Sequence, residues 1–194
     1  MKNKKNILLI LGHPLSKSFN GALTNAYAQG ARKKGFTVRK LELGKLKFDP
    51  ILRHAYKKRM KIEPDLASAI KDIKWAKHIV FFYPYWWGSC PALLQGFFER
   101  VFTPGFAFKF TGNYTWKKLL KGRSARLVLT MDTPPVLDRV VWRSAGIRSI
   151  KFNILEFCGI KPVKITRIGP VKSSSEAKKQ EWLKKIEKLG EGGE

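Results

Sequence analysis

The chain has 194 residues, of which 44% are hydrophobic and 12% aromatic, a composition typical of a soluble globular protein with one domain and a sizeable core. No apolar run approaches the roughly 20 residues that a transmembrane helix needs. The net charge of +25 would suit nucleic acid, an anionic membrane surface or acidic ligands. However, the basic residues are scattered, and no zinc finger, RNP-type motif or heptad array accompanies them, which disfavours nucleic-acid binding as the main function.

The N-terminus begins Met1-Lys2-Asn3-Lys4-Lys5 and resembles the start of a signal peptide. The apolar run that follows, residues 7–11, is shorter than the roughly 7–15 residues of a signal-peptide core and is stopped by Gly12-His13-Pro14. We therefore expect this run to be the first strand of the fold and the protein to stay in the cytoplasm.

Apolar runs alternate with helical periods along the chain. Strands are expected at residues 7–11, 37–43, 78–83, 124–131 and 163–168, and helices at 21–34, 65–76, 92–102 and 147–158. A capping box over residues 173–176 opens a last helix, which Gly190 is expected to end, leaving a disordered tail at 191–194. This alternation predicts a doubly wound, mostly parallel α/β sheet. The longer irregular segments, 45–63, 103–121 and 132–145, are expected to build a pocket or a subunit contact.

The third strand leads into an aromatic turn. Trp86 and Trp87 follow the end of that strand, where α/β proteins bind ligands. Such rings offer flat apolar surface to a flat cofactor or substrate. The alternative interpretation is that both are ordinary core aromatics.

The loop after the first strand, residues 12–20, leads into the first helix. Free backbone N–H groups at a helix N-terminus bind phosphate, and Ser16, Lys17, Ser18 and Asn20 add donors and positive charge. The loop fits neither GxxxxGK[ST] nor GxGxxG. It is therefore either an anion site or a polar turn with a serine cap.

The two cysteines, Cys90 and Cys158, have neither metal spacing nor a CxxC motif, and the chain has three histidines. We expect buried or pocket-lining thiols and no metal site.

Several blocks in sequence order carry a resemblance to a known family. They are Gly12-His13-Pro14 with Ser18-Phe19-Asn20, then Phe48-Asp49-Pro50-Ile51-Leu52, Pro84-Tyr85-Trp86-Trp87, Pro91-Ala92-Leu93-Leu94-Gln95-Gly96-Phe97-Phe98-Glu99-Arg100-Val101-Phe102 and Pro104-Gly105-Phe106-Ala107-Phe108. Together they resemble the flavodoxin-like NAD(P)H:quinone oxidoreductases, of the NAD(P)H dehydrogenase (quinone) or flavodoxin-2 type. The resemblance implies a single flavin-binding domain over residues 1–190. Its fold would be a five-stranded parallel sheet of order 2-1-3-4-5 with helices on both faces.

The resemblance also implies a flavin, FMN or FAD, held non-covalently at the carboxyl ends of the strands. Its phosphates would contact the first loop, its ring the aromatic turn, and the turn after the fourth strand would pass close by. The flavin contacts in the first loop would be His13, Ser18, Phe19 and Asn20. Those in the aromatic turn would be Pro84, Tyr85, Trp86 and Trp87, and those after the fourth strand Thr130, Met131 and Asp132. Trp87, Phe106 and Phe108 would wall the substrate pocket, with help from the second subunit of a homodimer.

The implied reaction passes a hydride from NAD(P)H to the flavin and then two electrons to a quinone or similar acceptor, with no protein group required as nucleophile or general base. One departure is that many members have Thr-Gly-Gly where this chain has Thr130-Met131-Asp132-Thr133. The tyrosine and histidine that assist hydride transfer in the family also have no clear equivalents in residues 136–146. The choices between FMN and FAD, and between NADH and NADPH, stay open.

Two readings from other classes compete with the enzyme. Relatives of this family regulate membrane potassium-efflux systems, and the basic surface would suit an accessory subunit at an anionic membrane face. A nucleic-acid-binding protein is the other alternative, and it predicts steeply salt-dependent binding.

Overall fold

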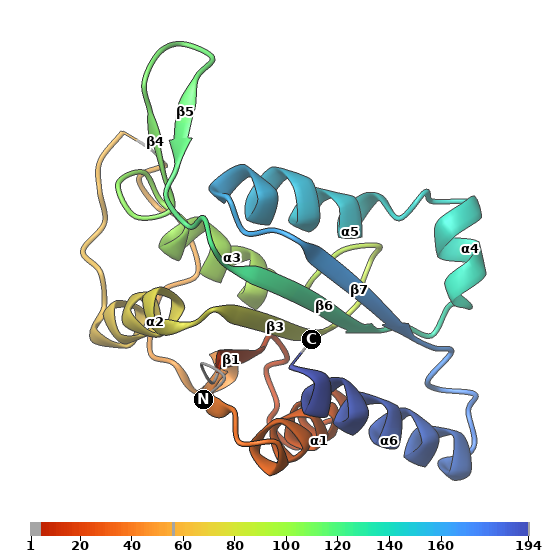
Figure 1. The fold of residues 1–194 in the computed structure, drawn as a ribbon. Coiled ribbons are helices and arrows are strands. Elements are labelled where there is room, and N and C mark those ends of the chain that lie inside the picture. Colours follow the sequence, from red (N-terminus) through yellow and green to blue (C-terminus); the bar gives the residue numbers. More distant parts are fainter. Residues whose placement is uncertain (1–4, 56, 194) are drawn as a thin grey trace.

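The computed structural model describes residues 5–55 and 57–193. Five parallel strands form the central sheet, in the order β2-β1-β3-β6-β7 (Figure 1). They are β1 (Asn6–Leu11), β2 (Thr37–Glu42), β3 (His78–Pro84), β6 (Ser124–Thr130) and β7 (Val163–Ile168). Counted within this sheet alone, the order is the expected 2-1-3-4-5, because β4 and β5 belong to a separate hairpin.

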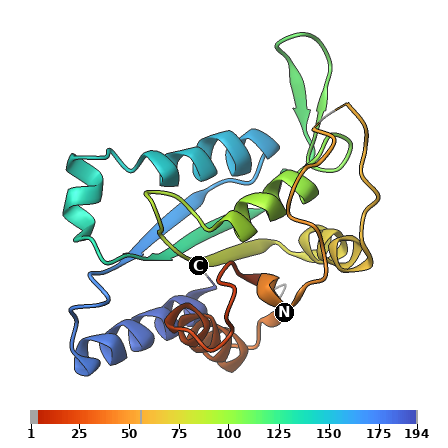
Figure 2. The ribbon, with the colours of Figure 1, turned by 180° about the vertical axis from the view of Figure 1, so that it is seen from behind.

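Helices cover both faces of the sheet (Figures 1 and 2). On one face lie α1 (Phe19–Lys33) and α6 (Glu176–Gly192). On the other lie α2 (Pro64–Trp75), α3 (Ala92–Val101) and α5 (Ala145–Arg148), which continues as the π-helix η2 (Ser149–Glu156). Two short elements, η1 (Leu43–Lys45) and α4 (Pro135–Val140), lie in the connections. Because both faces are covered, the central strands are continuously apolar, and every residue of β3 is buried.

The core consists of two layers, one on each side of the sheet. Leu23 and Tyr27 of α1 pack with Phe82 and with Ile186 of α6 on the first face. The second layer contains Phe97 of α3 and the buried stripe of the helix expected at 147–158. Of the apolar stripe that the spacing predicts there, Ile147, Ile150, Leu155 and Cys158 are buried and Ile154 is partly buried. Burial of these side chains is the main favourable contribution to folding.

The end of the chain differs from the expectation. The last helix runs to Gly192, and Gly193 caps it with a left-handed φ of 61°. The predicted disordered tail is therefore wrong for residues 191–193, and residue 194 lies outside the described part. Gly190 has a packing role instead, because a Cβ there would lie 2.2 Å from the Tyr27 carbonyl oxygen. The N-cap of this helix is Ser175, whose Oγ accepts from the Lys178 N–H at 3.2 Å.

Residues 103–121, expected to be irregular, contain a projecting hairpin. Its strands are β4 (Phe108–Phe110) and β5 (Trp116–Lys118), and it stands out from the body of the molecule at the top of Figure 1. Trp116 anchors its base, stacking on Phe157 with ring centroids 4.5 Å apart and donating its indole N–H to the Phe157 carbonyl at 3.0 Å. The hairpin tip therefore extends from a fixed base.

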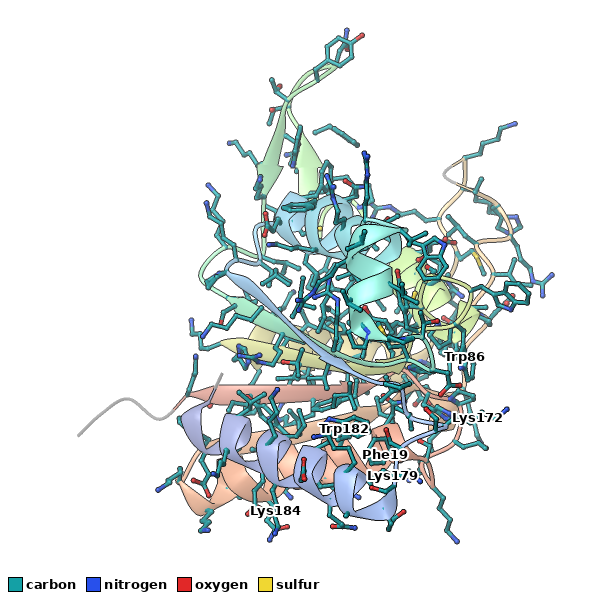
Figure 3. All side chains as sticks on the ribbon, turned by 90° about the vertical axis from the view of Figure 1, so that its right-hand side faces the viewer. Phe19, Trp86, Lys172, Lys179, Trp182 and Lys184 are labelled. Atoms are coloured by element: carbon teal, nitrogen blue, oxygen red, sulfur yellow. The ribbon has the colours of Figure 1, made fainter. Side chains whose placement is uncertain are left out.

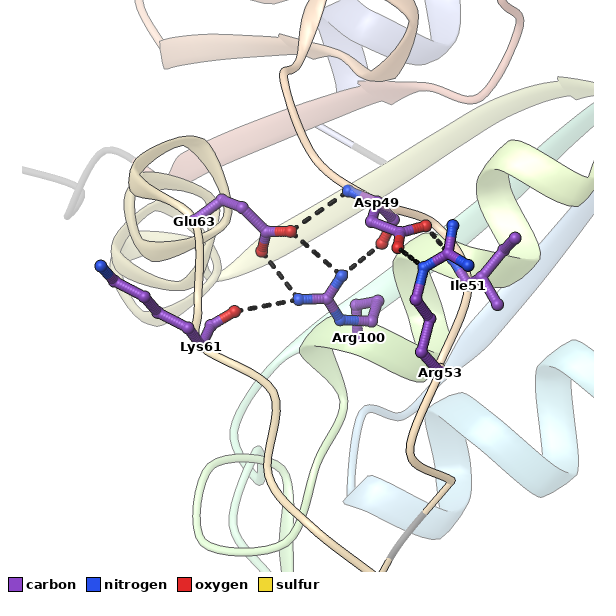
Figure 4. Close-up of polar contacts among 6 residues, drawn as sticks. All are labelled: Asp49, Ile51, Arg53, Lys61, Glu63 and Arg100. Carbon is purple, nitrogen blue, oxygen red and sulfur yellow. Dashed lines mark hydrogen bonds and ion pairs between the residues drawn. The ribbon is translucent and has the colours of Figure 1, made fainter.

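The long connection at 45–63 is held by one buried arginine (Figure 4). Arg100 of α3 is 1% exposed and donates to both carboxylate oxygens of Glu63, at 3.1 and 2.7 Å. It also donates to the carbonyls of Lys61, at 3.1 Å, and of Asp49. The guanidinium thus joins two distant points of a segment that has little regular structure of its own. Within residues 5–55 and 57–193, no helix has the length and apolarity needed to cross a membrane.

Candidate functional site

Three turns meet at the carboxyl edge of the sheet, next to the point where the strand order reverses between β1 and β3. They follow β1, β3 and β6, and they enclose a cavity of about 400 Å³, within the usual range for small-molecule sites. The cavity is lined by His13, Phe19, Asn20, Pro84, Tyr85, Trp86, Trp87, Thr130, Met131, Asp132, Thr133 and Val171. Every residue expected to contact the flavin except Ser18 is in this set. Phe19 and Trp86, which line this cavity, are labelled in Figure 3.

The N-terminus of α1 faces the cavity. Ser18 is the N-cap of the helix, and its Oγ accepts from the Gly21 N–H at 3.2 Å, so it serves the helix rather than the cavity wall. Asn20 donates its Nδ2 to Thr130 Oγ1 at 2.8 Å, which ties α1 to the end of β6. Its Oδ1 is buried without a hydrogen-bond partner in the described part of the chain. An unpaired buried acceptor is costly, and a bound ligand or water would satisfy it.

His13 is oriented by its own loop. Its Nδ1 accepts from the Leu15 N–H at 2.9 Å, and its ring meets Trp86 edge-on, with centroids 5.6 Å apart. Burial lowers the pKa of His13, which favours the neutral ring. Because Nδ1 is an acceptor, the proton of the neutral ring is on Nε2. His13 therefore offers one N–H donor to its surroundings.

The aromatic turn after β3 is strained and exposed. The Tyr85 N–H donates to the Thr130 carbonyl at 2.7 Å, which joins the turn to β6. Trp87 has a left-handed φ of 52° and is 103% exposed, while Trp86 is 46% exposed. The interpretation of these two residues as core aromatics is therefore wrong. A bulky residue in the left-handed region costs about 1–2 kcal/mol, and such strain is concentrated at functional sites.

The turn after β6 leaves the cavity open, although it lacks the glycine pair of many relatives. Thr130, Met131, Asp132 and Thr133 all line the cavity. Asp132 Oδ1 accepts from the Lys172 N–H at 2.9 Å, so its side chain is held by the connection between β7 and α6. The aspartate therefore fixes the turn without filling the space.

A second cavity of about 410 Å³ adjoins the first and shares Tyr85, Trp87 and Thr133 with it. Its other lining residues are Gly88, Asp138 and Trp142. Sequence reasoning named Thr133 as part of the turn next to the flavin but missed Asp138 and Trp142. A tryptophan in a predicted loop, Trp142, was the one sequence signal that could have pointed to this cavity.

Asp138 is the centre of a buried polar cluster behind the second cavity. It is 1% exposed, and its Oδ2 accepts from Ser144 Oγ at 2.8 Å and from Arg167 Nε at 3.2 Å. Arg167 Nη2 also donates to Ser144 Oγ at 2.7 Å. Burial, followed by the negative charge of Asp138, raises the pKa of Tyr85 to about 12, so this phenol stays protonated at neutral pH. Tyr85 Oη has no partner in hydrogen-bonding geometry in the described part.

The expected substrate-pocket residues are not together in one chain. Trp87 lines both cavities, but Phe106 and Phe108 line neither. Phe106 packs against the core, with Lys74 Nζ 5.7 Å from its ring centroid. Phe108 belongs to the hairpin and packs edge-on against Phe157, with centroids 5.0 Å apart. Both phenylalanines lie with the hairpin, beyond the C-terminal end of α3.

The cysteines and candidate metal ligands offer no further chemistry. Burial raises the pKa of Cys90 to about 11 and, as the main cause, that of Cys158 to about 12, so both thiols are protonated and weakly nucleophilic at neutral pH. In the part of the chain that the structure describes, no group of three or more His, Cys, Asp or Glu side chains could hold a metal ion.

Comparisons with known proteins identify the family of this fold. A family model described as a flavodoxin-like fold matches residues 5–190. The chain is 32% identical to NAD(P)H dehydrogenase [quinone] 1 of Cavia porcellus over 182 residues, covering 81% of this chain and 66% of that one. The crystal structure of Smu.1420 from Streptococcus mutans superposes with a TM-score of 0.83 and 29% identity, covering 96% and 99% of the chains. An NAD(P)H:quinone oxidoreductase from Methanothermobacter marburgensis shares the fold at a TM-score of 0.82 and 22% identity, covering 97% and 96%.

Proposed function

This chain belongs to the flavodoxin-like fold family, and on that premise we propose that it transfers a hydride from NAD(P)H to a bound flavin and then two electrons to a quinone or a similar flat acceptor. It is an oxidoreductase that uses flavin and NAD(P)H. The observation that carries the proposal is the cavity at the carboxyl edge of the sheet. Three turns converge there, and its lining includes all but one of the expected flavin contacts.

The residues present fit a flavin. The N-terminus of α1 provides backbone N–H groups and the positive end of the helix dipole, which suit a phosphate. His13 and Asn20 add polar contacts at the same end of the cavity. Trp86 and the backbone of the 84–87 turn offer a flat wall and amide groups to the ring. The unpaired Oδ1 of Asn20 would gain a partner there, either from the flavin or from an ordered water.

When bound, the flavin supplies the redox chemistry, accepting a hydride from one flat molecule and passing two electrons to another. The protein binds and orients the flavin and its substrates and shields them from solvent. Trp87 and Trp142 give the second cavity aromatic walls that suit flat rings. Because the two substrates would use the same aromatic space, we expect them to bind in turn, as a ping-pong mechanism requires. Tyr85 remains a protonated phenol beside this space.

A homodimer would explain why Phe106 and Phe108 lie away from Trp87. The hairpin that carries Phe108 projects from the body (Figure 1), and its exposed rings, Phe110 and Tyr114, would be available to a second subunit. The segment around α4 also exposes an apolar surface next to the second cavity. It consists of Val136, Leu137, Val140, Val141 and Trp142. We expect two copies to cover these surfaces and to complete each other's substrate pocket. Sedimentation of the flavin-loaded protein at several concentrations measures whether it is a dimer.

The test is flavin retention by the purified protein after incubation with FMN or FAD and desalting, followed by quinone reduction with NAD(P)H. Wild type should retain one flavin and turn over. Asn20→Ala removes the contact to Thr130 and should weaken flavin binding about tenfold, or about 1.4 kcal/mol. Asn25→Ala is the matched control, because Asn25 lies on the same helix but is exposed and away from the cavity. Retention of neither flavin by wild type would contradict the proposal.

A further inference from the structure

Beside the second cavity lies a basic hollow of about 600 Å³ that the proposed chemistry does not use. Its walls are Arg143, Ala145, Arg148, Ser149, Phe152 and Asn153, and we refer to it as the basic hollow. We propose that the basic hollow binds the 2′-phosphate of NADPH, so that the enzyme prefers NADPH to NADH. This inference rests on the proposed function, because it assigns the phosphate of the electron donor to a place next to the redox site.

The basic hollow and the second cavity lie along the same short segment. Trp142 lines the second cavity, while Arg143 and Ala145, the next residues along, line the basic hollow. Gly146 presses this segment onto the aromatic turn, since a Cβ there would lie 2.0 Å from the Gly88 carbonyl oxygen. Gly88 itself lines the second cavity. Residues 142–145 therefore connect the lining of the second cavity to that of the basic hollow.

The chemistry of the basic hollow suits a phosphate monoester. Two guanidinium groups, one hydroxyl and one carboxamide are donors that can bind phosphate oxygens, and the arginine fork matches phosphate geometry. Neither Arg143 nor Arg148 has a hydrogen bond or ion pair through its side chain within residues 5–55 and 57–193. Residues 139–155 include no aspartate or glutamate. The nearest acidic side chain along the helix, Glu156, lies 3.8 Å from Lys151 Nζ.

The backbone fixes the position of Arg143 at a cost. Arg143 and Ser144 both have left-handed φ angles, 49° and 53°. Two successive non-glycine residues in this region cost about 1–2 kcal/mol each. The buried bonds of Ser144 to Asp138 and Arg167 hold this conformation. Strain maintained by a buried network is typical of functional sites. Here it fixes the backbone position from which the Arg143 side chain extends.

The π-helical winding of η2 brings the remaining donors to one face. In a π-helix, hydrogen bonds connect residues five apart, and such segments are frequent at functional sites. Arg148 lies four and five residues before Phe152 and Asn153, Ser149 lies four residues before Asn153, and all four line the wall of the basic hollow. Lys151 Nζ lies 4.8 Å from the centroid of the Phe152 ring and adds a further positive charge close by.

The test compares NADPH and NADH as donors to the flavin-loaded holoenzyme. We expect wild type to have at least a tenfold higher kcat/KM for NADPH. Arg143→Gln and Arg148→Gln should each lower the NADPH-to-NADH ratio of kcat/KM about tenfold, through the KM for NADPH. Arg139→Gln is the matched control, because Arg139 is exposed on the neighbouring helix α4 and does not line the basic hollow. Its ratio should stay that of wild type.

Equal use of both donors by wild type would overturn the proposal. So would a KM that rises equally for NADH and NADPH in the two variants, since the basic hollow would then bind the pyrophosphate common to both. Calorimetry with 2′,5′-ADP and 5′-ADP is independent of turnover. Wild type should bind 2′,5′-ADP at least tenfold more tightly, and the double variant should lose that difference. If the protein retains no flavin but shows this preference, the proposed function fails while the phosphate site stands.

Discussion

Two arginines, the buried Arg100 and the partly buried Arg167, hold two long connections of this molecule in different ways. Arg100 makes four contacts with Glu63 and two backbone carbonyls, and it pins the segment 49–63 to α3. Arg167 shares Ser144 and Asp138 with a strained turn beside the second cavity. The first cluster satisfies its guanidinium with protein groups alone. The second leaves Asp138 Oδ1 without a partner in the described part.

The Arg100 cluster affects only the stability of the protein, whereas the Asp138 cluster also affects the shape of the site. A buried charge whose partners are all within the protein contributes when it is complete and costs several kcal/mol when it is broken. None of Arg100, Glu63, Lys61 and Asp49 lines either of the two site cavities. The Asp138 cluster bonds Ser144 of the left-handed Arg143–Ser144 pair, and Asp138 itself lines the second cavity, so a change there alters the site as well as the free energy of unfolding.

Breaking the Arg100 cluster should give the largest loss of stability. Arg100→Met leaves Glu63 and two carbonyls without their donor, and we expect the free energy of unfolding to fall by about 3–5 kcal/mol. Urea denaturation measures this through the transition midpoint. Arg53→Met is the control, because its ion pair with Asp49 is exposed and screened by solvent, so we expect its loss to change stability little. Equal losses for the two variants would show that Arg100 is not the anchor.

Asp138→Asn should have a smaller effect on stability and a larger one on function. Asparagine keeps an acceptor for Ser144 but removes the charge opposite Arg167, which should cost about 2 kcal/mol. The KM for NADPH should rise, because Trp142 and Arg143 lose their fixed positions. Arg100→Met, assayed at a temperature where it is folded, should keep the wild-type KM. The same KM for NADPH in both variants would show that the two clusters do not differ in their effect on the site.

Acid should weaken the first cluster. Burial alone would raise the pKa of Glu63, but the hydrogen bonds from Arg100 and from the Asp49 N–H outweigh it and lower that pKa. A carboxyl with a lowered folded-state pKa stabilises the protein above its unfolded-state pKa, near 4.5, and this contribution disappears as pH falls through the folded value. The stability difference between wild type and Arg100→Met should therefore shrink from pH 6 to pH 3. A stability difference that stays constant over this pH range would contradict the proposed ion pair between Arg100 and Glu63.

Trp87 should show the smallest effect on stability. Its side chain is fully exposed, so Trp87→Ala should change the free energy of unfolding by about 0.5 kcal/mol or less. Trp87→Gly should raise it by about 1 kcal/mol, since glycine accepts the left-handed φ without strain. Both variants should lose about tenfold in kcat/KM for the quinone. Unchanged quinone kinetics would mean that the exposed ring has another role.

The sequence was sufficient for the sheet and for most of the cavity lining. Continuous apolar runs indicate strands covered on both faces, and strand ends of a parallel sheet meet at one edge, which marks the turn at Trp86 as a ligand site. The placement of His13 and Thr130 at the same site came from the family resemblance. Ser18 was placed correctly in the loop, but spacing cannot tell whether a serine hydroxyl caps a helix or faces a ligand. The extent of α6 was missed because Gly190 was read as a stop, whereas its lack of a Cβ allows α6 to approach Tyr27 closely.

Other features depend on contacts between segments far apart in the chain. Asp138 and Arg167 are 29 residues apart, and only the folded chain brings them together. The left-handed conformation of Trp87, Arg143 and Ser144 breaks the local preference of each residue. Such conflicts between local preference and tertiary structure are expected at functional sites, so they are also where sequence patterns fail.

The distribution of tryptophans gives the protein two separate optical signals. Trp86, Trp87 and Trp142 border the cavities and contact solvent, whereas Trp116 is stacked on Phe157 at the hairpin base. Fluorescence from the first group should be quenched when a flavin or a nucleotide fills the cavities. Emission from Trp116 should follow unfolding instead. Single-tryptophan variants would thus follow ligand occupancy and chain integrity in the same sample, without an added label.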